Sequence, residues 1–486
     1  MKVMIESAAE LHGVERRAKD PSLRASIRDG QFHALMLGAG ETYLGPFGIF
    51  LGASTLQIGF LATLPALFGA IMQWFGVLAM GHFGSRRRII VTGVLCQAAT
   101  WLPMAMLPFV FGHEHAAVVA LIVLAMAYHG AAGLVAPLWN SLIGDLVRDD
   151  MRGRFFGRRN QLTGISTFLA LLVAGGILEV SKRMDYAAFG FLTIFLASTV
   201  ARVFSARWLA RYSDPPPRAP EHPQADSWSG FLAARGRAGF VRFALFAATI
   251  NLAVSFSGPY FSLYMLRDLE LSYLQFTLVT AASAISQFLT FRYWGELSDR
   301  FGNKKILNLC GYGIATVPLL WLFSAKLLYL ILIQVWGGFV WAGYSLAAAN
   351  YMFDAIEPAH RTRAAAFQGL LNGVFVCTGS LAGGLVASHL PARLAVGAFS
   401  WQPVSTLLFI FAISGLLRIL AAALFLRRFR EIRDVESIGH GELIFRISHI
   451  RPIAGATFGV ITGLFGDKND SGEKTDEEAH VGSDAA

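Results

Sequence analysis

The chain has 486 residues, of which 55% are hydrophobic and only 15% are charged, and its mean hydropathy is +0.51. Soluble domains carry about 25% charged residues, so this composition excludes an ordinary soluble protein and indicates a membrane protein. The net charge of +9 is typical of cytoplasmic loops that face anionic lipid headgroups, and no nucleic-acid-binding motif accompanies it.

Twelve stretches of mostly apolar residues are long enough to cross a bilayer, which takes about 20 residues. They lie at 32–53, 57–81, 89–111, 116–144, 161–181, 187–209, 241–264, 273–294, 305–325, 327–351, 364–389 and 401–426. We therefore predict an all-α integral membrane protein with twelve transmembrane helices in two six-helix bundles.

The predicted domains follow from these spans. They are a polar N-terminal tail (1–31), a first bundle (32–210), a proline-rich linker (211–240), a second bundle (241–427) and a tail (428–486) with an interfacial segment at 442–465 and an acidic end. The first 31 residues contain no apolar core, so we expect no cleavable signal peptide.

Basic residues predict the orientation, because loops rich in Lys and Arg stay in the cytoplasm. Most of them fall in the two tails, the linker and the loops on the same side of the predicted membrane. We expect a multi-pass protein of the plasma (bacterial inner) membrane, with both termini in the cytoplasm.

The second half of the chain repeats the first in six places, 208 to 218 residues later and in the same order. The repeated features are Gly45-Pro46 and Gly258-Pro259; Ser54-x-Leu56-Gln57 and Ser272-x-Leu274-Gln275; Gly84 and Gly302, each before a basic cluster; the pattern D-x6-R-x-R at Asp145, Arg152 and Arg154 and at Asp354, Arg361 and Arg363; Gly175-Gly176 and Gly383-Gly384; and Ser198, Arg202 and Arg211 with Ser414, Arg418 and Arg427. Parallel repeats of this size build many transporters, so the two bundles are predicted to be duplicates.

Polar residues inside the spans are the candidates for substrate binding or coupling, because a polar group in lipid is costly unless it faces a cavity or a partner. The foremost is Glu41, which lies among glycines in the first span and could bind a cation or carry a proton. The others are His129, Asn251, Gln287, Tyr344 and Asn372. For each of them the alternative is a hydrogen bond that only packs the bundle. Arg202 and Arg418 lie toward span ends, where snorkelling or a shared structural role is expected.

The segment Gly295-Glu-Leu297-Ser-Asp299-Arg300-Phe-Gly302-Asn-Lys304-Lys305 resembles the signature loop of the major facilitator superfamily. The resemblance extends over 30–430 and implies that Gly295, Asp299, Arg300, Gly302 and Lys304 help to hold the cytoplasmic side closed. The first-half copy departs from the pattern, because Gly81 and His82 occupy the acidic and basic positions. We therefore expect a degraded latch there and assign Asp145, Arg152, Arg154, Asp354, Arg361 and Arg363 to gating; ordinary surface ion pairs are the alternative.

These features predict a secondary transporter that moves a small solute by alternating access, with protons as a candidate coupling ion. We find no catalytic motif and no phosphate-binding loop, so neither an enzyme nor a cofactor is predicted, and a monomer is expected. The sparse internal charge favours a neutral, amphipathic or cationic solute, and Leu171-Leu172 replace the Gly-Pro expected in the signature of drug antiporters. The alternative is a transporter-like sensor or assembly factor that acts through its C-terminal tail.

Overall fold

The structure is a computed structural model. It describes residues 21–83, 85–112, 114–147, 152–215, 238–356, 361–390, 394–396, 399–401, 404–426 and 430–432. The predicted interfacial segment at 442–465 and the acidic end lie outside these residues.

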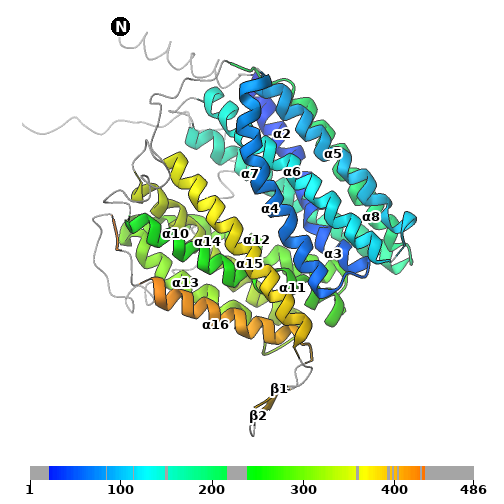
Figure 1. Cartoon of the computed structure of the whole chain (residues 1–486), viewed down its shortest axis with the longest axis vertical. Coiled ribbons are helices and arrows are strands. Elements are labelled where there is room, and N and C mark those ends of the chain that lie inside the picture. Colours follow the sequence, from blue (N-terminus) through cyan, green and yellow to red (C-terminus); the bar gives the residue numbers. More distant parts are fainter. Residues whose placement is uncertain are drawn as a thin grey trace, which may run out of the picture. The chain divides into compact units, whose positions relative to one another are not determined.

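The first half forms one helical bundle (Figure 1). Its elements are α2 (Pro21–Ala39), η1 (Glu41–Tyr43), α3 (Leu44–Phe50), α4 (Thr55–Phe83), α5 (Arg86–Val110), α6 (His115–Leu146), α7 (Arg152–Arg183) and α8 (Ala187–Leu209). Helix α2 packs against α7 and α8, and α6 packs against α4 and α5.

The second half repeats this arrangement in a second bundle (Figure 1). It contains α10 (Ala238–Ser255), α11 (Gly258–Leu263), η3 (Tyr264–Asp268), α12 (Tyr273–Phe301), α13 (Asn303–Leu320), α14 (Leu327–Ala355), α15 (Arg361–His389), β1 (Leu394–Val396), β2 (Phe399–Trp401) and α16 (Leu407–Phe425). The strands β1 and β2 form one antiparallel hairpin before α16.

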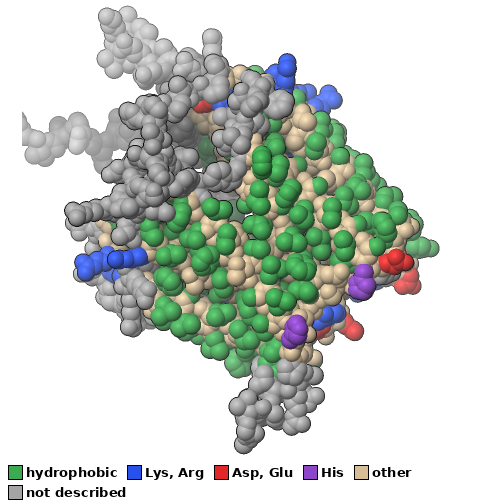
Figure 2. Space-filling model, in the orientation of Figure 1, with side chains coloured by type: hydrophobic (Ala, Val, Ile, Leu, Met, Phe, Trp, Pro, Cys, Tyr) green, Lys and Arg blue, Asp and Glu red, His purple; other side chains and the backbone are tan. Residues whose placement is uncertain are grey.

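Ten helices among the described residues are long and apolar enough to cross a membrane. The other two predicted spans also coincide with helical segments, the α2–α3 segment and α13. Figure 2 shows why lipid is the expected solvent: hydrophobic side chains cover most of the face in view, and charged side chains lie at its margins.

Two predicted boundaries were wrong. The first span is not one continuous helix, because α2 begins at Pro21 and ends at Ala39, before the 3-10 turn that carries Glu41. The last span begins at Leu407 and not at 401, because the preceding sequence contains Gln402, Pro403 and Ser405, which do not favour an apolar helix.

The repeated Gly-Pro motif marks the same break in both bundles. Helix α2 gives way to α3, and α10 gives way to α11, close to Gly45-Pro46 and Gly258-Pro259. Proline has no backbone N–H to donate, so the helical hydrogen-bond ladder is interrupted there. The first and seventh spans are therefore broken helices, whose freed backbone groups need other partners.

The repeated S-x-L-Q motif proves to be a helix N-cap. Ser54 and Gln57 exchange backbone-to-side-chain hydrogen bonds of 2.9 and 3.3 Å at the start of α4, and Ser272 and Gln275 form the same capping box with the same distances at the start of α12. We call the end of the molecule that contains Ser54 and Ser272 the capping-box end. The opposite end, with residues 85–88 and 302–305, is the signature-turn end.

The bundles meet at the capping-box end. The hydroxyl of Tyr43 donates to the carbonyl of Leu171 at 2.9 Å and lies 2.7 Å from Thr277 Oγ1 of the other bundle. At a second contact between the bundles, the hydroxyl of Tyr260 donates to the carbonyl of Ser380, whose own hydroxyl donates to the carbonyl of Gly59. Both tyrosines are fully buried. The first helix of each bundle thus places a tyrosine in the contact between bundles.

The repeated glycine pairs lie at these contacts. A Cβ at Gly175 would clash with Thr277 and Tyr43, and one at Gly384 would clash with the hydroxyl of Tyr260 and come within 3.3 Å of Leu56 in the other bundle. Glycine is therefore favoured at these contacts, because a larger residue would have to displace the side chains packed against it.

Candidate functional site

Glu41 lies in the break of the first helix and contacts the centre of α6. The buried hydroxyl of Tyr128 donates to Glu41 Oε2 at 2.7 Å, and the Tyr128 ring stands edge-on to that of His129, with centroids 5.0 Å apart. His129 is close enough to interact electrostatically with Glu41. The structure therefore brings these two predicted residues together through Tyr128, which the sequence analysis did not identify.

Arg202 of α8 is the main buried cation near Glu41. Its side chain donates from Nε to Gln97 Oε1 at 2.7 Å and from Nη1 to Ser205 Oγ at 2.9 Å, and its charge interacts with Glu41 and Asp29. Of the two roles expected for Arg202, snorkelling was wrong, because the residue is only 6% exposed. Its role lies inside the bundle, where neighbouring acids neutralise its charge.

Asp29 continues this network toward the signature-turn end. It accepts hydrogen bonds from Ser205 (2.6 Å) and from the phenol of Tyr212 (3.2 Å), and Arg159 Nη2 lies 3.8 Å from its carboxylate. Burial raises the pKa of the Tyr212 phenol well above its ordinary value, so the phenol stays protonated and donates. Charged and polar side chains therefore connect Glu41 with the end of α8.

Arg418 is the duplicate of Arg202, but its surroundings are different. It is 2% exposed and donates to the carbonyls of Ile314 (3.1 Å) and Val254 (3.5 Å) and to the hydroxyl of Ser257 (3.0 Å). Two of these groups belong to the break between α10 and α11. Arg418 thus binds carbonyl and hydroxyl oxygens at the broken helix, so snorkelling was wrong for it too.

The candidates of the second bundle lie in separate environments. Asn251 Nδ2 donates to Asn372 Oδ1 at 3.2 Å, which links α10 to α15, and Gln368 also donates to Asn372. Gln287 lies half-buried where α12 approaches Gly338 of α14. No contact joins these residues to Glu41 or His129 within the described part of the chain.

Tyr344 is the most unusual of the candidates in the second bundle. Its ring is buried between Phe246 and Trp341, while its hydroxyl has no hydrogen-bond partner among the described residues. A buried hydroxyl without a partner is costly, so this position suits a polar group supplied by a bound solute.

At the signature turn of the second bundle, Gly302 joins α12 to α13 with φ +88°, a conformation that favours glycine. Asp299 and Arg300 are exposed, and the Arg300 guanidinium lies 5.2 Å from the centre of the Phe301 ring. A Cβ at Gly295 would meet Leu346 at an ordinary 3.7 Å, and the gating role of Gly295 stays a prediction.

The duplicated aspartates both reach the turns. Asp354 accepts from Asn303 Nδ2 at 2.8 Å, and Asp145 accepts from Arg86 Nη1 at 2.6 Å. Helices α7 and α15 begin at the duplicated arginines Arg152 and Arg361. The side chains of Arg152, Arg154, Arg361 and Arg363 lie outside the described residues, so their pairing stays a prediction.

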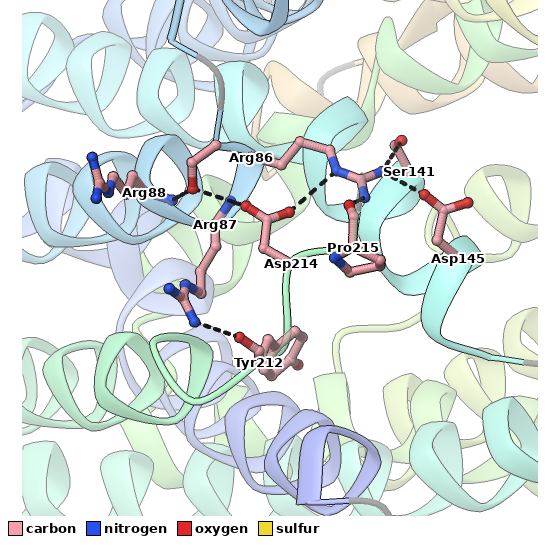
Figure 3. A network of polar contacts seen from close by, with 9 residues as sticks. Arg86, Arg87, Arg88, Ser141, Asp145, Tyr212, Asp214 and Pro215 are labelled. Carbon is pink, nitrogen blue, oxygen red and sulfur yellow. Dashed lines mark hydrogen bonds and ion pairs between the residues drawn. The ribbon is translucent and has the colours of Figure 1, made fainter. Parts of the chain in front are cut away.

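The turn of the first bundle binds the start of the linker (Figure 3). The guanidinium of Arg86, with its side chain 2% exposed, lies between Asp145 and Asp214 and donates to the carbonyl of Pro215 at 2.6 Å. Arg87 donates from its side chain to the carbonyl of Tyr212 at 2.8 Å. The degraded copy of the signature turn therefore retains ordered charge contacts, made within its own bundle.

Three residues of these networks were not predicted as site residues from the sequence: Asp29, Tyr128 and Asp214. Asp29 and Asp214 lie just outside the predicted spans, where charged residues are common, and a tyrosine in a span gives no sign of its partner. A closer comparison of the halves could have found Asp214, which follows Arg211 as Glu431 follows Arg427. No group of three or more His, Cys, Asp or Glu residues in the described part could hold a metal ion.

Comparison with known proteins gives a consistent result. The model of the family "Major Facilitator Superfamily" matches residues 32–260 and 243–466. Among solved structures, a D-xylose-proton symporter has a TM-score of 0.66 at 15% identity and covers 86% of this chain and 98% of its own. The nucleoside transporter NupG has a TM-score of 0.58 at 14% identity and covers 85% of this chain and 100% of its own.

A curated relative is the tetracycline resistance protein, class H, of Pasteurella multocida, 33% identical over 118 residues. The match spans 24% of this chain and 29% of the length of that relative. The family match, by contrast, covers both bundles, and the solved structures share the fold of both. The chain therefore belongs to the Major Facilitator Superfamily and is a membrane transporter.

Proposed function

We propose that the protein is a proton-coupled secondary transporter in which Glu41 is the coupling carboxylate. It resides in the plasma (inner) membrane with both termini and the signature-turn end in the cytoplasm, and it works by alternating access. Family membership favours transport over the sensor or assembly-factor alternative and over an enzyme.

The contact between Glu41 and Tyr128 carries this proposal. A carboxylate in a broken membrane helix can exchange a proton where the backbone is already irregular, and its protonation removes a negative charge beside Arg202. The balance of charge around Arg202 and Asp29 would then change. Proton binding at Glu41 can thus alter the packing of α2 against α8 within the first bundle.

The solute proposed is small and neutral or cationic. Glu41 supplies a negative charge in the first bundle, and the Tyr344 hydroxyl supplies a polar group in the second. A solute that binds between the bundles would meet both halves and would favour their rocking around it. The polar amides of Asn251 and Asn372 are further candidates for contacts with it.

The experiment is solute flux in proteoliposomes with a broad metabolite mixture, an imposed pH gradient and mass spectrometry. The Glu41→Gln variant should lose gradient-driven accumulation and keep solute exchange, because a neutral amide cannot release a proton. Glu114→Gln is the control, since Glu114 makes no side-chain capping bond and lies between predicted spans; its flux should match the wild type.

Two outcomes contradict the proposal. Accumulation that persists in Glu41→Gln would remove Glu41 from coupling while leaving transport intact. The absence of any protein-dependent flux from folded protein would contradict transport by this chain.

A further inference from the structure

In each bundle, a carboxylate that follows the last helix binds the first turn of the third membrane span. This span is α5 in the first bundle and α13 in the second. In the first bundle, Asp214 Oδ2 accepts from the backbone N–H of Arg87 at 3.1 Å and from Ser85 Oγ at 2.8 Å, at the start of α5. In the second bundle, Glu431 Oε2 accepts from the backbone N–H of Lys304 at 2.7 Å, at the start of α13.

These two contacts are copies of one another. Asp214 follows Arg211 by three residues and Glu431 follows Arg427 by four, and these arginines are duplicated positions after the last helices α8 and α16. Arg87 is the second residue of α5, and Lys304 is the second residue of α13. A carboxylate at this place is favourable, because the first N–H groups of a helix have no partner within the helix and carry partial positive charge.

The two bundles depend on the contact to different degrees. The signature turn of the second bundle contains its own acid, Asp299, whereas the first bundle has Gly81 at that position. In the first bundle, Asp214 also lies 3.5 Å from the Nε of the buried Arg86. Figure 3 shows the carboxylate of Asp214 between the start of α5 and the Arg86 guanidinium. Asp214 therefore binds both the first turn of α5 and the buried Arg86 in the bundle whose turn has no acid at the position of Asp299.

We infer that Asp214 and Glu431 are duplicated clasp residues, which fasten the linker and the C-terminal tail to the two signature turns and set the position of these turns during gating. The clasp of the first bundle carries the larger share, because its turn has Gly81 where the second bundle has Asp299, and because Asp214 also pairs with the buried Arg86. The described residues 213–215 and 430–432, which follow α8 and α16, are then working parts of the gate.

Two solute-free measurements test the clasps. Spin labels are attached at Arg88→Cys and Glu296→Cys, two exposed positions on opposite bundles, after Cys96→Ala, Cys310→Ala and Cys377→Ala substitution. Pulsed electron spin resonance gives the distance distribution between the bundles, and hydrogen exchange of 85–92, 210–215 and 303–308 reports the clasps themselves.

Asp214→Asn should raise exchange at 85–92 and 210–215 about tenfold and shift the distance distribution. Glu431→Gln should raise exchange at 303–308 and shift the distribution less, since Asp299 remains. Asp214→Glu, which keeps the charge, should restore most of the wild-type distribution. Glu114→Gln is the control, because it removes a carboxylate at the start of α6 that makes no capping hydrogen bond. It should change neither measurement.

The inference is overturned if Asp214→Asn leaves the distance distribution unchanged while exchange rises, because Asp214 would then anchor the linker without affecting the gate. A larger shift in Glu431→Gln than in Asp214→Asn would overturn the assigned asymmetry. Neither result depends on solute transport, so the proposed function would stand or fall separately.

Discussion

At the scale of single residues, the buried arginines show how duplicated positions acquire different roles. Arg202 faces the acids Asp29 and Glu41, whereas Arg418 binds the neutral oxygens of Ile314, Val254 and Ser257. A buried cation with acidic partners becomes part of a charge balance, and removing it leaves uncompensated negative charge. When a buried cation that binds neutral oxygens is removed, only carbonyl and hydroxyl groups without a hydrogen-bond donor remain.

This difference predicts the order of two substitutions. Arg202→Met should lower the stability of the detergent-solubilised protein by about 3–5 kcal/mol, because Glu41 loses its buried counter-charge and Asp29 is left with Arg159. Arg418→Met should cost about 1–3 kcal/mol, as expected for unsatisfied buried oxygens. The check is thermal unfolding at one pH in one detergent. An equal or larger loss in Arg418→Met would contradict the charge argument.

At the scale of elements, short repeated motifs correspond to local devices that recur in both bundles. The S-x-L-Q motif caps α4 and α12, and the Gly-Pro motif marks the breaks of the first and seventh spans. The glycine pairs serve the close approach of α7 to α12 and of α15 to α4. The residues within such a pair are not equivalent, because Gly176 has open space where a Cβ would lie and Gly175 does not.

The glycine pair gives a matched experiment on the capping-box end. Gly175→Ala should separate α7 from α12, since its methyl group would overlap Thr277 and Tyr43, whereas Gly176→Ala should have little effect. Spin labels at the exposed positions Met184→Cys and Leu328→Cys should report a longer distance only in the first variant. Identical distributions for both variants would show that this close approach does not hold the end closed.

At the scale of the whole molecule, the described contacts that carry the fold lie before residue 437. The chain divides into a unit of Met1–Glu436 and a second unit of Ser437–Ala486, and the described helices and strands all belong to the first. We therefore expect transport by rocking bundles to need the first unit alone.

Deletion of residues 437–486 should therefore leave the rate of solute flux within about twofold of that of the full chain, because it removes no contact within the first unit. Flux per folded protein is measured in proteoliposomes, with the full-length chain reconstituted at the same lipid-to-protein ratio. A loss of transport in a folded truncated protein would assign the tail a required role.

The sequence by itself determined the class of protein, the twelve spans and the duplication, and it singled out Glu41, whose coupling role stays a prediction. These properties can be read from short segments of the chain. The length of an apolar span is set by the thickness of the bilayer, and a carboxylate inside a span is conspicuous because a charge in lipid is costly. A repeated motif is visible in the order of residues. Only the tertiary structure decided the partners. Tyr128 on Glu41, Asp29 beside Arg202 and Asp214 on the first turn of α5 are separated by 87, 173 and 127 residues from the groups that they serve. Side-chain partners at such separations depend on helix rotation and packing, which hydrophobic patterning constrains only to within one face of a helix.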